Sequence, residues 1–151
     1  MRITKDNINQ FINGITMNCN NMDITHIDYI PDNIKYLYCS CNKLTELPKL
    51  PDGLYGLDCS NNNLTSLTKL PESLGHLYCY DNKLTQLPKL PHALEELDCH
   101  NNKLTELSKL PNGLYGLDCD NNNLPYPITF DNIKEHNKLI KRKEILSKIC
   151  V

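Results

Sequence analysis

The chain repeats itself in two consecutive stretches, LYGLDCSNNNLTSLTKLP (residues 54–71) and LGHLYCYDNKLTQLPKLP (residues 74–91). Matching letters lie 20 residues apart, and the same offset continues in both directions along the chain. Its clearest markers are six cysteines, Cys19, Cys39, Cys59, Cys79, Cys99 and Cys119. A fixed period of this length predicts a solenoid, in which each repeat forms one turn and stacks on the next.

Each unit also has apolar residues at fixed distances from its cysteine. In the unit around Cys79 these residues are Leu74, Leu77, Leu84, Leu87 and Leu90. An asparagine stands three residues after five of the six cysteines: Asn42, Asn62, Asn82, Asn102 and Asn122. A proline closes five units: Pro31, Pro51, Pro71, Pro91 and Pro111. The unit is therefore L-x-x-L-x-C-x-x-N-x-L-T-x-L-x-K-L-P.

Physical chemistry suggests how such a unit folds. A turn of 20 residues cannot bury its own apolar side, but turns stacked at the strand spacing of about 4.8 Å share one continuous core. The L-x-C segment predicts a short strand with leucine and cysteine inward and their neighbours outward. The Leu-Pro segments favour an extended, polyproline-like return, because proline lacks the N–H that a helix requires. The predicted fold is one curved parallel sheet of short strands with an extended convex side.

The unit resembles the leucine-rich repeat, L-x-x-L-x-L-x-x-[N/C]-x-L, with cysteine in the third apolar position. Its length and its Leu-Pro runs (residues 47–51 and 87–91) are similar to repeats of secreted bacterial effectors and of giant-virus proteins. The resemblance covers about residues 14–127. It implies a leucine-rich repeat solenoid of the α/β class, a role in host–pathogen protein binding, and a place in the host cytosol.

Both ends of the chain are predicted to cap the solenoid. Residues 1–14 contain Ile8, Phe11 and Ile12 at helical spacing, with Gly14 as the C-terminal stop. Residues 15–127 form the six-rung solenoid. Residues 128–151 are expected to form a longer capping helix ending near Ile149. The apolar residues expected on its inner side are Ile133, Leu139, Ile140, Ile145, Leu146 and Ile149.

Composition argues against several classes of protein. The chain of 151 residues has 16 Lys and Arg against 18 Asp and Glu, so a protein that coats nucleic acid is not expected. No apolar run reaches the ~18–20 residues of a membrane span, and the first residues do not resemble a signal peptide. A cytoplasmic protein without membrane contact is predicted. Cysteines that pack as small apolar residues fit the same reducing compartment.

Three chemical interpretations of the cysteines are disfavoured. Cysteines in register on parallel strands are poorly oriented for a disulfide, and none has a metal-ligand spacing. Cys79-Tyr80-Asp81 matches the Cys-x-Asp nucleophile of ubiquitin-ligase effectors, but Cys79 is expected to point inward. As a metal or acid–base site, the group Asp98, His100, Asp118 and Asp120 is disfavoured because the sequence shows no pocket, nucleophile or ligand spacing for it. No catalytic residue, cofactor or metal site is therefore predicted, and a relic of a ligase is the least favoured alternative.

The outward strand residues are the candidate binding surface, because solenoids usually bind on the concave face. Tyrosine is a common interface anchor, and the C-terminal part of this face is acidic. The predicted partner-binding residues are Tyr36, Tyr38, Asp58, His76, Tyr78, Tyr80, Glu96, Asp98, His100, Asp118 and Asp120. The first hypothesis is a non-enzymatic module that binds a protein.

A self-associating scaffold remains open as a second hypothesis. Residues 128–151 carry six Lys and Arg against three acids, a net charge of +3, and the remainder of the chain therefore carries −5. Opposite charges on the tail and on the concave face would allow copies of the chain to associate. A homo-oligomer is therefore an alternative to a separate partner.

Overall fold

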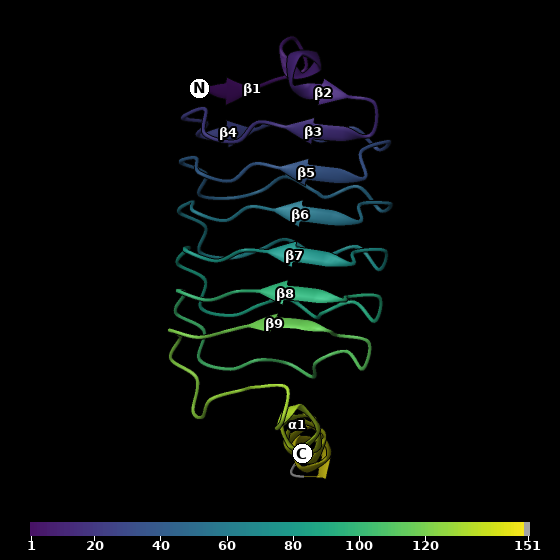
Figure 1. The fold of residues 1–151 in the computed structure, drawn as a ribbon, viewed down its shortest axis with the longest axis vertical. Helices are drawn as coiled ribbons and strands as arrows, with labels where there is room; N and C mark the ends of the chain where they lie inside the picture. Colours follow the sequence, from purple (N-terminus) through teal and green to yellow (C-terminus); the bar gives the residue numbers. More distant parts are fainter. Residues whose placement is uncertain (150–151) are drawn as a thin grey trace.

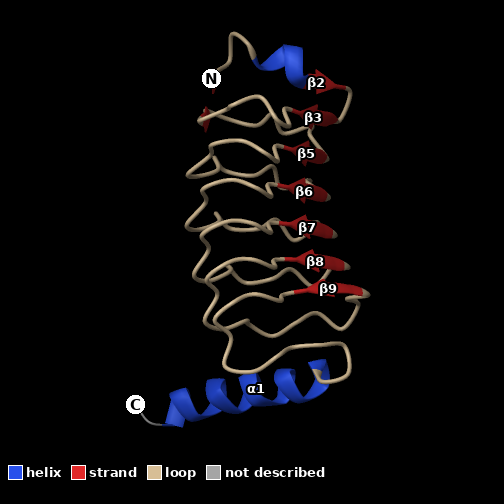
Figure 2. Cartoon of the chain, turned by 60° about the vertical axis from the view of Figure 1, so that its left-hand side comes forward, coloured by secondary structure: helices blue, strands red, loops and turns tan. Residues whose placement is uncertain are grey.

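The computed structural model describes residues 1–149 and shows a stack of 20-residue turns, here called rungs (Figure 1). Each rung contributes a strand of three residues to one side of the stack (Figure 2). These strands are β3 (Thr16–Asn18), β5 (Tyr36–Tyr38), β6 (Gly56–Asp58), β7 (His76–Tyr78), β8 (Glu96–Asp98) and β9 (Gly116–Asp118). They pair in parallel with partners 20 residues apart, as Leu57 does with Leu77. The predicted leucine-rich repeat solenoid is confirmed.

The N-terminal end closes differently from the predicted simple helix. Its helical part is one 3₁₀ turn, η1 (Ile8–Phe11), followed by β2 (Ile12–Asn13), which pairs antiparallel with β3. Gly14 has φ +60° and lies in the tight turn between these strands, so it forms a hairpin rather than stopping a helix. On the opposite side of the first rung, β1 (Arg2–Ile3) pairs in parallel with β4 (His26–Ile27).

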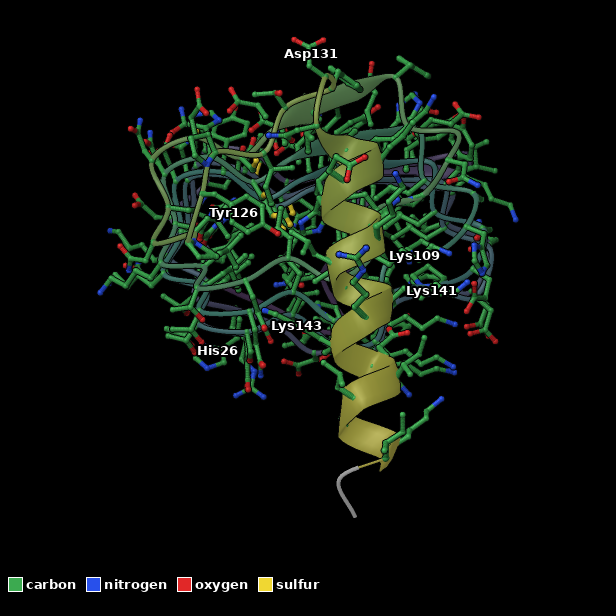
Figure 3. The ribbon with its side chains drawn as sticks, turned by 90° about the horizontal axis from the view of Figure 1, so that it is seen from below. His26, Lys109, Tyr126, Asp131, Lys141 and Lys143 are labelled. Atoms are coloured by element: carbon green, nitrogen blue, oxygen red, sulfur yellow. The ribbon has the colours of Figure 1, made fainter. Side chains whose placement is uncertain are left out.

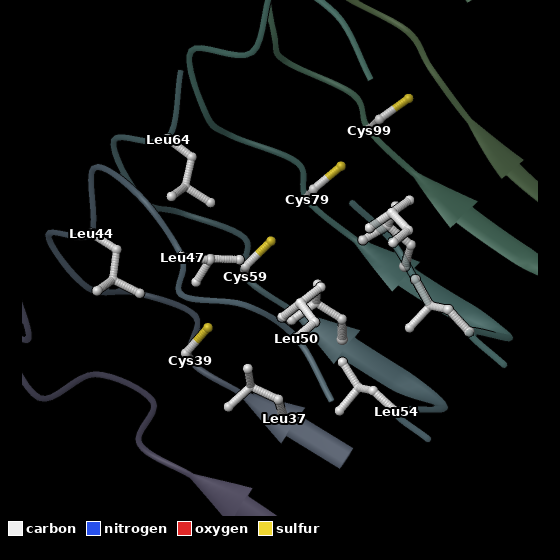
Figure 4. Packing of buried hydrophobic residues seen from close by; sticks show 14 of the residues in the cluster. Leu37, Cys39, Leu44, Leu47, Leu50, Leu54, Cys59, Leu64, Cys79 and Cys99 are labelled. Carbon is white, nitrogen blue, oxygen red and sulfur yellow. The ribbon is translucent and has the colours of Figure 1, made fainter. Parts of the chain in front are cut away.

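The core is a continuous column of aliphatic side chains with the cysteines in one row (Figure 4). Leu77 and Cys79 alternate inward along β7 and its extension, and both are fully buried. The seven cysteines among residues 1–149 are free thiols, and only Cys41 of these is exposed. Burial raises the pKa of Cys19 to about 12 and that of Cys119 to about 11. The cysteine row therefore consists of protonated thiols that pack as apolar residues.

The repeated asparagines link adjacent rungs through their side-chain amides. Asn82 Nδ2 donates to the carbonyl oxygen of Cys59 in the preceding rung at 3.0 Å and to that of Cys79 in its own rung at 3.2 Å. Its Oδ1 accepts the backbone N–H of Leu64 at 2.9 Å. The same pattern recurs at Asn42, Asn62, Asn102 and Asn122. Each amide therefore satisfies backbone groups that are buried where the chain leaves the strand.

The residue before each of these asparagines has a left-handed backbone. Its φ lies between 50° and 55° in five successive rungs, at Cys41, Asn61, Asp81, Asn101 and Asn121. Asparagine and aspartate adopt this conformation more readily than other residues with a Cβ. The recurrence of asparagine in the repeat therefore has two structural causes, the amide bridge and this turn. Of these five left-handed residues, Cys41 is the one that is neither asparagine nor aspartate.

α1 (Ile133–Ile149) crosses the end of the last rung, with Tyr126 to one side of it and Lys109 to the other (Figure 3). Its contacts with the rung include polar ones. The buried His136 lies 2.9 Å from the hydroxyl of Tyr126 and 3.1 Å from the carbonyl of Ser108. Asn137 accepts the N–H of Leu110 at 2.8 Å and donates to its carbonyl at 2.9 Å. The Asn137 amide thus makes the hydrogen bonds to Leu110 that the backbone of a further rung would make.

α1 begins at Ile133, five residues after the predicted start, and residues 150–151 of the prediction lie outside the described residues. The predicted inner face is wrong beyond the first turns of the helix. Ile133 packs against the core. Four of the expected inner residues are instead between 42% and 70% exposed: Leu139, Ile145, Leu146 and Ile149. The end of α1 extends past the stack on the side away from the strands, where no rung lies beneath it (Figure 2). Within residues 1–149, no helix has the length and apolar content needed to cross a membrane.

We expect Asn82→Ala to lower the free energy of unfolding by about 2–4 kcal/mol, because it leaves buried backbone groups of two rungs without partners. Urea unfolding followed by circular dichroism measures this loss. The matched control is Asn63→Ala, since Asn63 accepts a hydrogen bond from the exposed Lys83 ammonium. Its effect should stay within about 0.5 kcal/mol. Equal losses for the two variants would contradict the role assigned to the amide bridge.

A second prediction concerns Cys41, the cysteine among the five residues with a left-handed backbone. Cys41→Asn should raise the free energy of unfolding by about 0.5–1 kcal/mol, because asparagine tolerates φ near +55° better than cysteine. Cys41→Ala removes the same exposed thiol without this advantage and serves as the control. Thermal unfolding should place Cys41→Asn above both the wild type and Cys41→Ala. A midpoint no higher than that of Cys41→Ala would show that the backbone conformation is not the cause.

Candidate functional site

The candidate site is the strand face, which we define as the outward residues three before, one before and one after each repeat cysteine, together with Tyr55 and Glu95 from the position four before it. Strand alternation explains its composition: Leu77 and Cys79 point inward, so His76, Tyr78 and Tyr80 point outward. Most of these side chains in the middle rungs are half-buried. They therefore stand on a rigid sheet while keeping part of their surface available for contact.

Four aromatic side chains form a row across β5, β6 and β7. The ring centroids of Tyr36 and Tyr55 are 5.9 Å apart and nearly perpendicular. The ring of Tyr55 is 5.1 Å from that of His76, which is 6.4 Å from Tyr78 in an edge-on arrangement. Separations of 4.5–7 Å with tilted or edge-on rings are favourable for aromatic pairs. We call these four residues the aromatic row.

Two glycines make room for this row. A Cβ at Gly56 would lie 3.0 Å from Cδ1 of Tyr36, and a Cβ at Gly75 would lie 2.6 Å from Cε2 of Tyr55. Each tyrosine ring therefore lies over the backbone of the following rung, where a larger residue would displace it. Gly56 and Gly75 therefore leave the space that the rings of Tyr36 and Tyr55 occupy.

Two carboxylates contact the last three residues of the aromatic row. The Tyr55 hydroxyl donates to Oε2 of Glu95 at 3.2 Å, and Nε2 of His76 lies 3.6 Å from the same oxygen. The Tyr78 hydroxyl donates to Glu96. The bond to Glu95 raises the pKa of Tyr55, while partial burial, and then Glu96, raise that of Tyr78. Both hydroxyls therefore remain protonated donors at neutral pH.

A second group, here called the acidic cluster, consists of Asp98 on β8, Asp118 on β9, and Tyr80 and His100, which come two residues after the ends of β7 and β8. Nδ1 of His100 is 2.6 Å from Oδ1 of Asp98 and 3.7 Å from Oδ2 of Asp118. The ring of Tyr80 stacks on His100 with centroids 4.7 Å apart and planes 7° from parallel. Asp120 extends this group, and its backbone N–H donates to Asp118 at 3.1 Å.

The environment of His100 acts on its pKa in two directions. Partial burial lowers the pKa, whereas the hydrogen bond to Asp98 and the charges of Asp98, Asp118 and Asp81 raise it. The net result is a pKa above the ordinary value for histidine. Protonation would offset part of the negative charge of the cluster, and the remaining charge would still be negative because more than one carboxylate surrounds the ring.

The acidic cluster has donor atoms of the kinds that bind metal ions. One donor atom each from Asp98, His100 and Asp118 lies within 4.8 Å of the others. Exposed acidic groups often lie this close without a metal. Within the described residues, no Ser or Cys side chain is hydrogen-bonded to His100, so the cluster lacks the paired nucleophile and base of covalent catalysis.

The cysteine of the ligase-like motif is not arranged for catalysis. Cys79 is fully buried, and burial, with small contributions from Cys59, Cys99 and Asp98, raises the pKa of its thiol well above the ordinary value. A cysteine nucleophile needs an accessible sulfur and a lowered pKa. The letters Cys-x-Asp therefore occur here as part of the repeat, with Asp81 in the left-handed turn.

The strand face carries negative charge that lysine and arginine of the same chain do not neutralise. Among the ion pairs within residues 1–149, those of its carboxylates involve only the histidines His76 and His100. The lysines with ion pairs lie elsewhere, as Lys43 does with Asp23 and Lys138 with Glu135. The lysines in register on the returning segments, Lys49, Lys69, Lys89 and Lys109, are exposed.

The structure divides the predicted binding residues into groups. Tyr36, His76 and Tyr78 belong to the aromatic row, whereas Tyr80, Asp98, His100 and Asp118 form the acidic cluster, beside Asp120. Glu96 contacts the row through Tyr78. Tyr38 and Asp58 are partners across β5 and β6, and Asp58 accepts a hydrogen bond from the Ser60 hydroxyl at 2.6 Å.

The sequence analysis missed Tyr55 and Glu95, which lie four residues before their cysteines. A strict alternation of inward and outward residues leaves this position out. The chain turns into the strand here, so the inward residues Leu54 and Leu57 are three apart and both residues between them lie outside the core. A spacing of three between inward leucines was the signal in the sequence.

Comparisons with known proteins agree with the repeat and the fold. The leucine-rich repeat family model matches residues 53–77 and 93–117. YopM from Yersinia enterocolitica is 39% identical with a TM-score of 0.68, over 72% of this chain and 25% of that one. YopM from Yersinia pestis, a leucine-rich effector protein, is 38% identical with a TM-score of 0.70, over 73% and 32%. A Shigella effector LRR domain is 31% identical with a TM-score of 0.74, over 78% and 54%.

The chain thus spans between a quarter and about half of the length of these solved structures. No curated protein gives a significant match. The predicted likeness to bacterial effector repeats is confirmed, and the likeness to giant-virus proteins stays a prediction. The repeat motif, the parallel solenoid and these matches identify the chain as a leucine-rich repeat protein.

Proposed function

We propose that the strand face binds a protein partner through the aromatic row and the acidic cluster. The observation that carries this proposal is the continuity of the two groups over β5 to β9 on one rigid sheet. Half-exposed tyrosines supply large contact areas with little side-chain freedom to lose, and their hydroxyls supply directional hydrogen bonds. The function is therefore recognition without chemistry.

The likeness to YopM and to the Shigella effector domain supports a module for protein interaction. A role inside a host cell is part of the same proposal. The buried free thiols fit it, because a reducing compartment keeps such cysteines unpaired. The burial of Cys79 argues against the alternative of a degenerate ligase.

Self-association is a second candidate function, and the surface of α1 favours it. The exposed side chains Leu139, Ile145, Leu146 and Ile149 lie on a helix that also carries six Lys and Arg. Such a surface is complementary to an acidic, aromatic sheet in both apolar character and charge. One copy of the chain would then present α1 to the strand face of another.

The first candidate predicts that Tyr78→Ala combined with Tyr80→Ala abolishes partner binding without unfolding the protein. Affinity capture from a candidate host lysate, quantified by mass spectrometry, should show at least a tenfold loss of captured partner. That is the order of effect expected when central aromatic anchors are truncated. The matched control, Lys69→Ala with Lys89→Ala, alters the opposite side and should capture as the wild type does. Full capture by the tyrosine variant would sink the proposal.

The second candidate predicts oligomers that weaken with salt. Sedimentation velocity at low and high ionic strength should show a larger species at low salt, because charge attraction over exposed surfaces is screened. Replacing Ile145 and Leu146 with serine should shift the protein to the monomer. A monomer at every concentration and salt level rejects self-association.

A further inference from the structure

We propose that the acidic cluster is a binding site for an arginine side chain on the partner protein. This inference rests on the proposed function, since it gives the chemistry of the partner at one part of the strand face. The site consists of the carboxylates of Asp98 and Asp118 and the stacked rings of Tyr80 and His100.

The charge of the strand face requires a cationic partner. The positions three before, one before and one after the repeat cysteines hold no Lys or Arg, and Lys35 occupies the position of Tyr55 one rung earlier. The same positions hold five carboxylates, at Asp58, Glu96, Asp98, Asp118 and Asp120. Within the described residues, the ion-pair partner of these carboxylates is His100, so their charge is offset only in part in the free protein. A partner with acidic groups would be repelled, whereas a basic segment would be attracted and oriented.

The positions of the two aspartates match the shape of a guanidinium group. Asp98 and Asp118 are register partners on adjacent parallel strands, so their carboxylates stand side by side on the same face. Nδ1 of His100 lies 2.6 Å from Oδ1 of Asp98 and 3.7 Å from Oδ2 of Asp118, so the two carboxylates are close enough for one guanidinium to reach both. Arginine presents several N–H donors in a rigid planar fork and can engage both carboxylates at once.

The stacked rings favour arginine over lysine. Tyr80 and His100 lie almost parallel with centroids 4.7 Å apart, so two aromatic rings stand beside the carboxylates. A guanidinium is planar, weakly hydrated and stacks on aromatic rings, whereas an ammonium is compact and strongly hydrated. A site that combines aromatic rings with two carboxylates therefore selects the arginine side chain.

The test uses the full chain and three fluorescent peptides in which glycine alternates with arginine, lysine or glutamate. Fluorescence anisotropy measures binding at low salt in the presence of a chelator, so that a metal bridge cannot contribute. We expect the arginine peptide to bind at least threefold more tightly than the lysine peptide, and the glutamate peptide to show no binding. Added salt should weaken the binding of the arginine peptide.

Variants then assign the binding to the cluster. Asp98→Asn with Asp118→Asn keeps the shapes of both side chains and should reduce affinity for the arginine peptide by on the order of tenfold. The matched control, Asp52→Asn with Glu72→Gln, removes the same charge from exposed residues on the returning segments. It should leave the affinity within twofold of the wild-type value. Thermal unfolding verifies that both variants remain folded.

Three results would overturn the inference: no binding of the arginine peptide, equal affinity for arginine and lysine peptides, or equal losses in the two variants. The same variants in lysate capture separate this inference from the proposed function. If the strand face binds a partner without arginine recognition, capture depends on Tyr78 and Tyr80 but is unchanged by Asp98→Asn with Asp118→Asn. That result would overturn the arginine site and leave the protein-binding proposal standing.

Discussion

The buried hydrogen bonds of one asparagine side chain per rung join adjacent rungs beside the sheet. The backbone ladder itself continues past each three-residue strand, as from the N–H of Cys79 to the carbonyl of Asp98 and from that of Asp81 to the carbonyl of His100. The amide of Asn82 reinforces this register by reaching the carbonyl of Cys59 in one rung and that of Cys79 in the next. Its oxygen accepts the N–H of Leu64, which sets where the chain leaves the strand. The bridge and the backbone ladder together support the register that places Asp98 beside Asp118.

The same geometry explains why the inward position beside the bridge is a cysteine. The carbonyls that accept from the asparagine belong to Cys59 and Cys79, so the side chain at this point lies in the crowded bend between strand and turn. Cysteine is small and apolar enough to be fully buried there. Burial also keeps its thiol protonated, because a thiolate would lose its hydration without gaining a counter-ion. A residue that could have been a nucleophile is therefore a packing residue.

Most of the fold could be predicted from the sequence because the same local pattern recurs in six units. Leu77 and Cys79 identify a strand, and Asn82 identifies the turn that follows it. The predictions were weakest where the repeat ends. The inner face of α1 was overestimated because periodicity marks Ile145 and Leu146 as apolar but does not say whether a rung lies under them. The strand face was predicted in composition, whereas the stacking of Tyr80 on His100 depends on spacing between rungs that no local pattern contains.

The distribution of charge follows from the different roles of the inward, turn and outward positions within each rung. The inward positions are used by the core and the turn positions by asparagine, so most outward strand positions are not needed to fill the core. A face that needed only solubility would mix both signs of charge, as the turns do at Lys49 and Asp52. The strand face instead combines carboxylates with tyrosine and histidine. Carboxylates on adjacent strands repel one another, and His100, beside Asp98 and Asp118, offsets part of this cost when it is protonated. The basic partner that we propose would offset more of it.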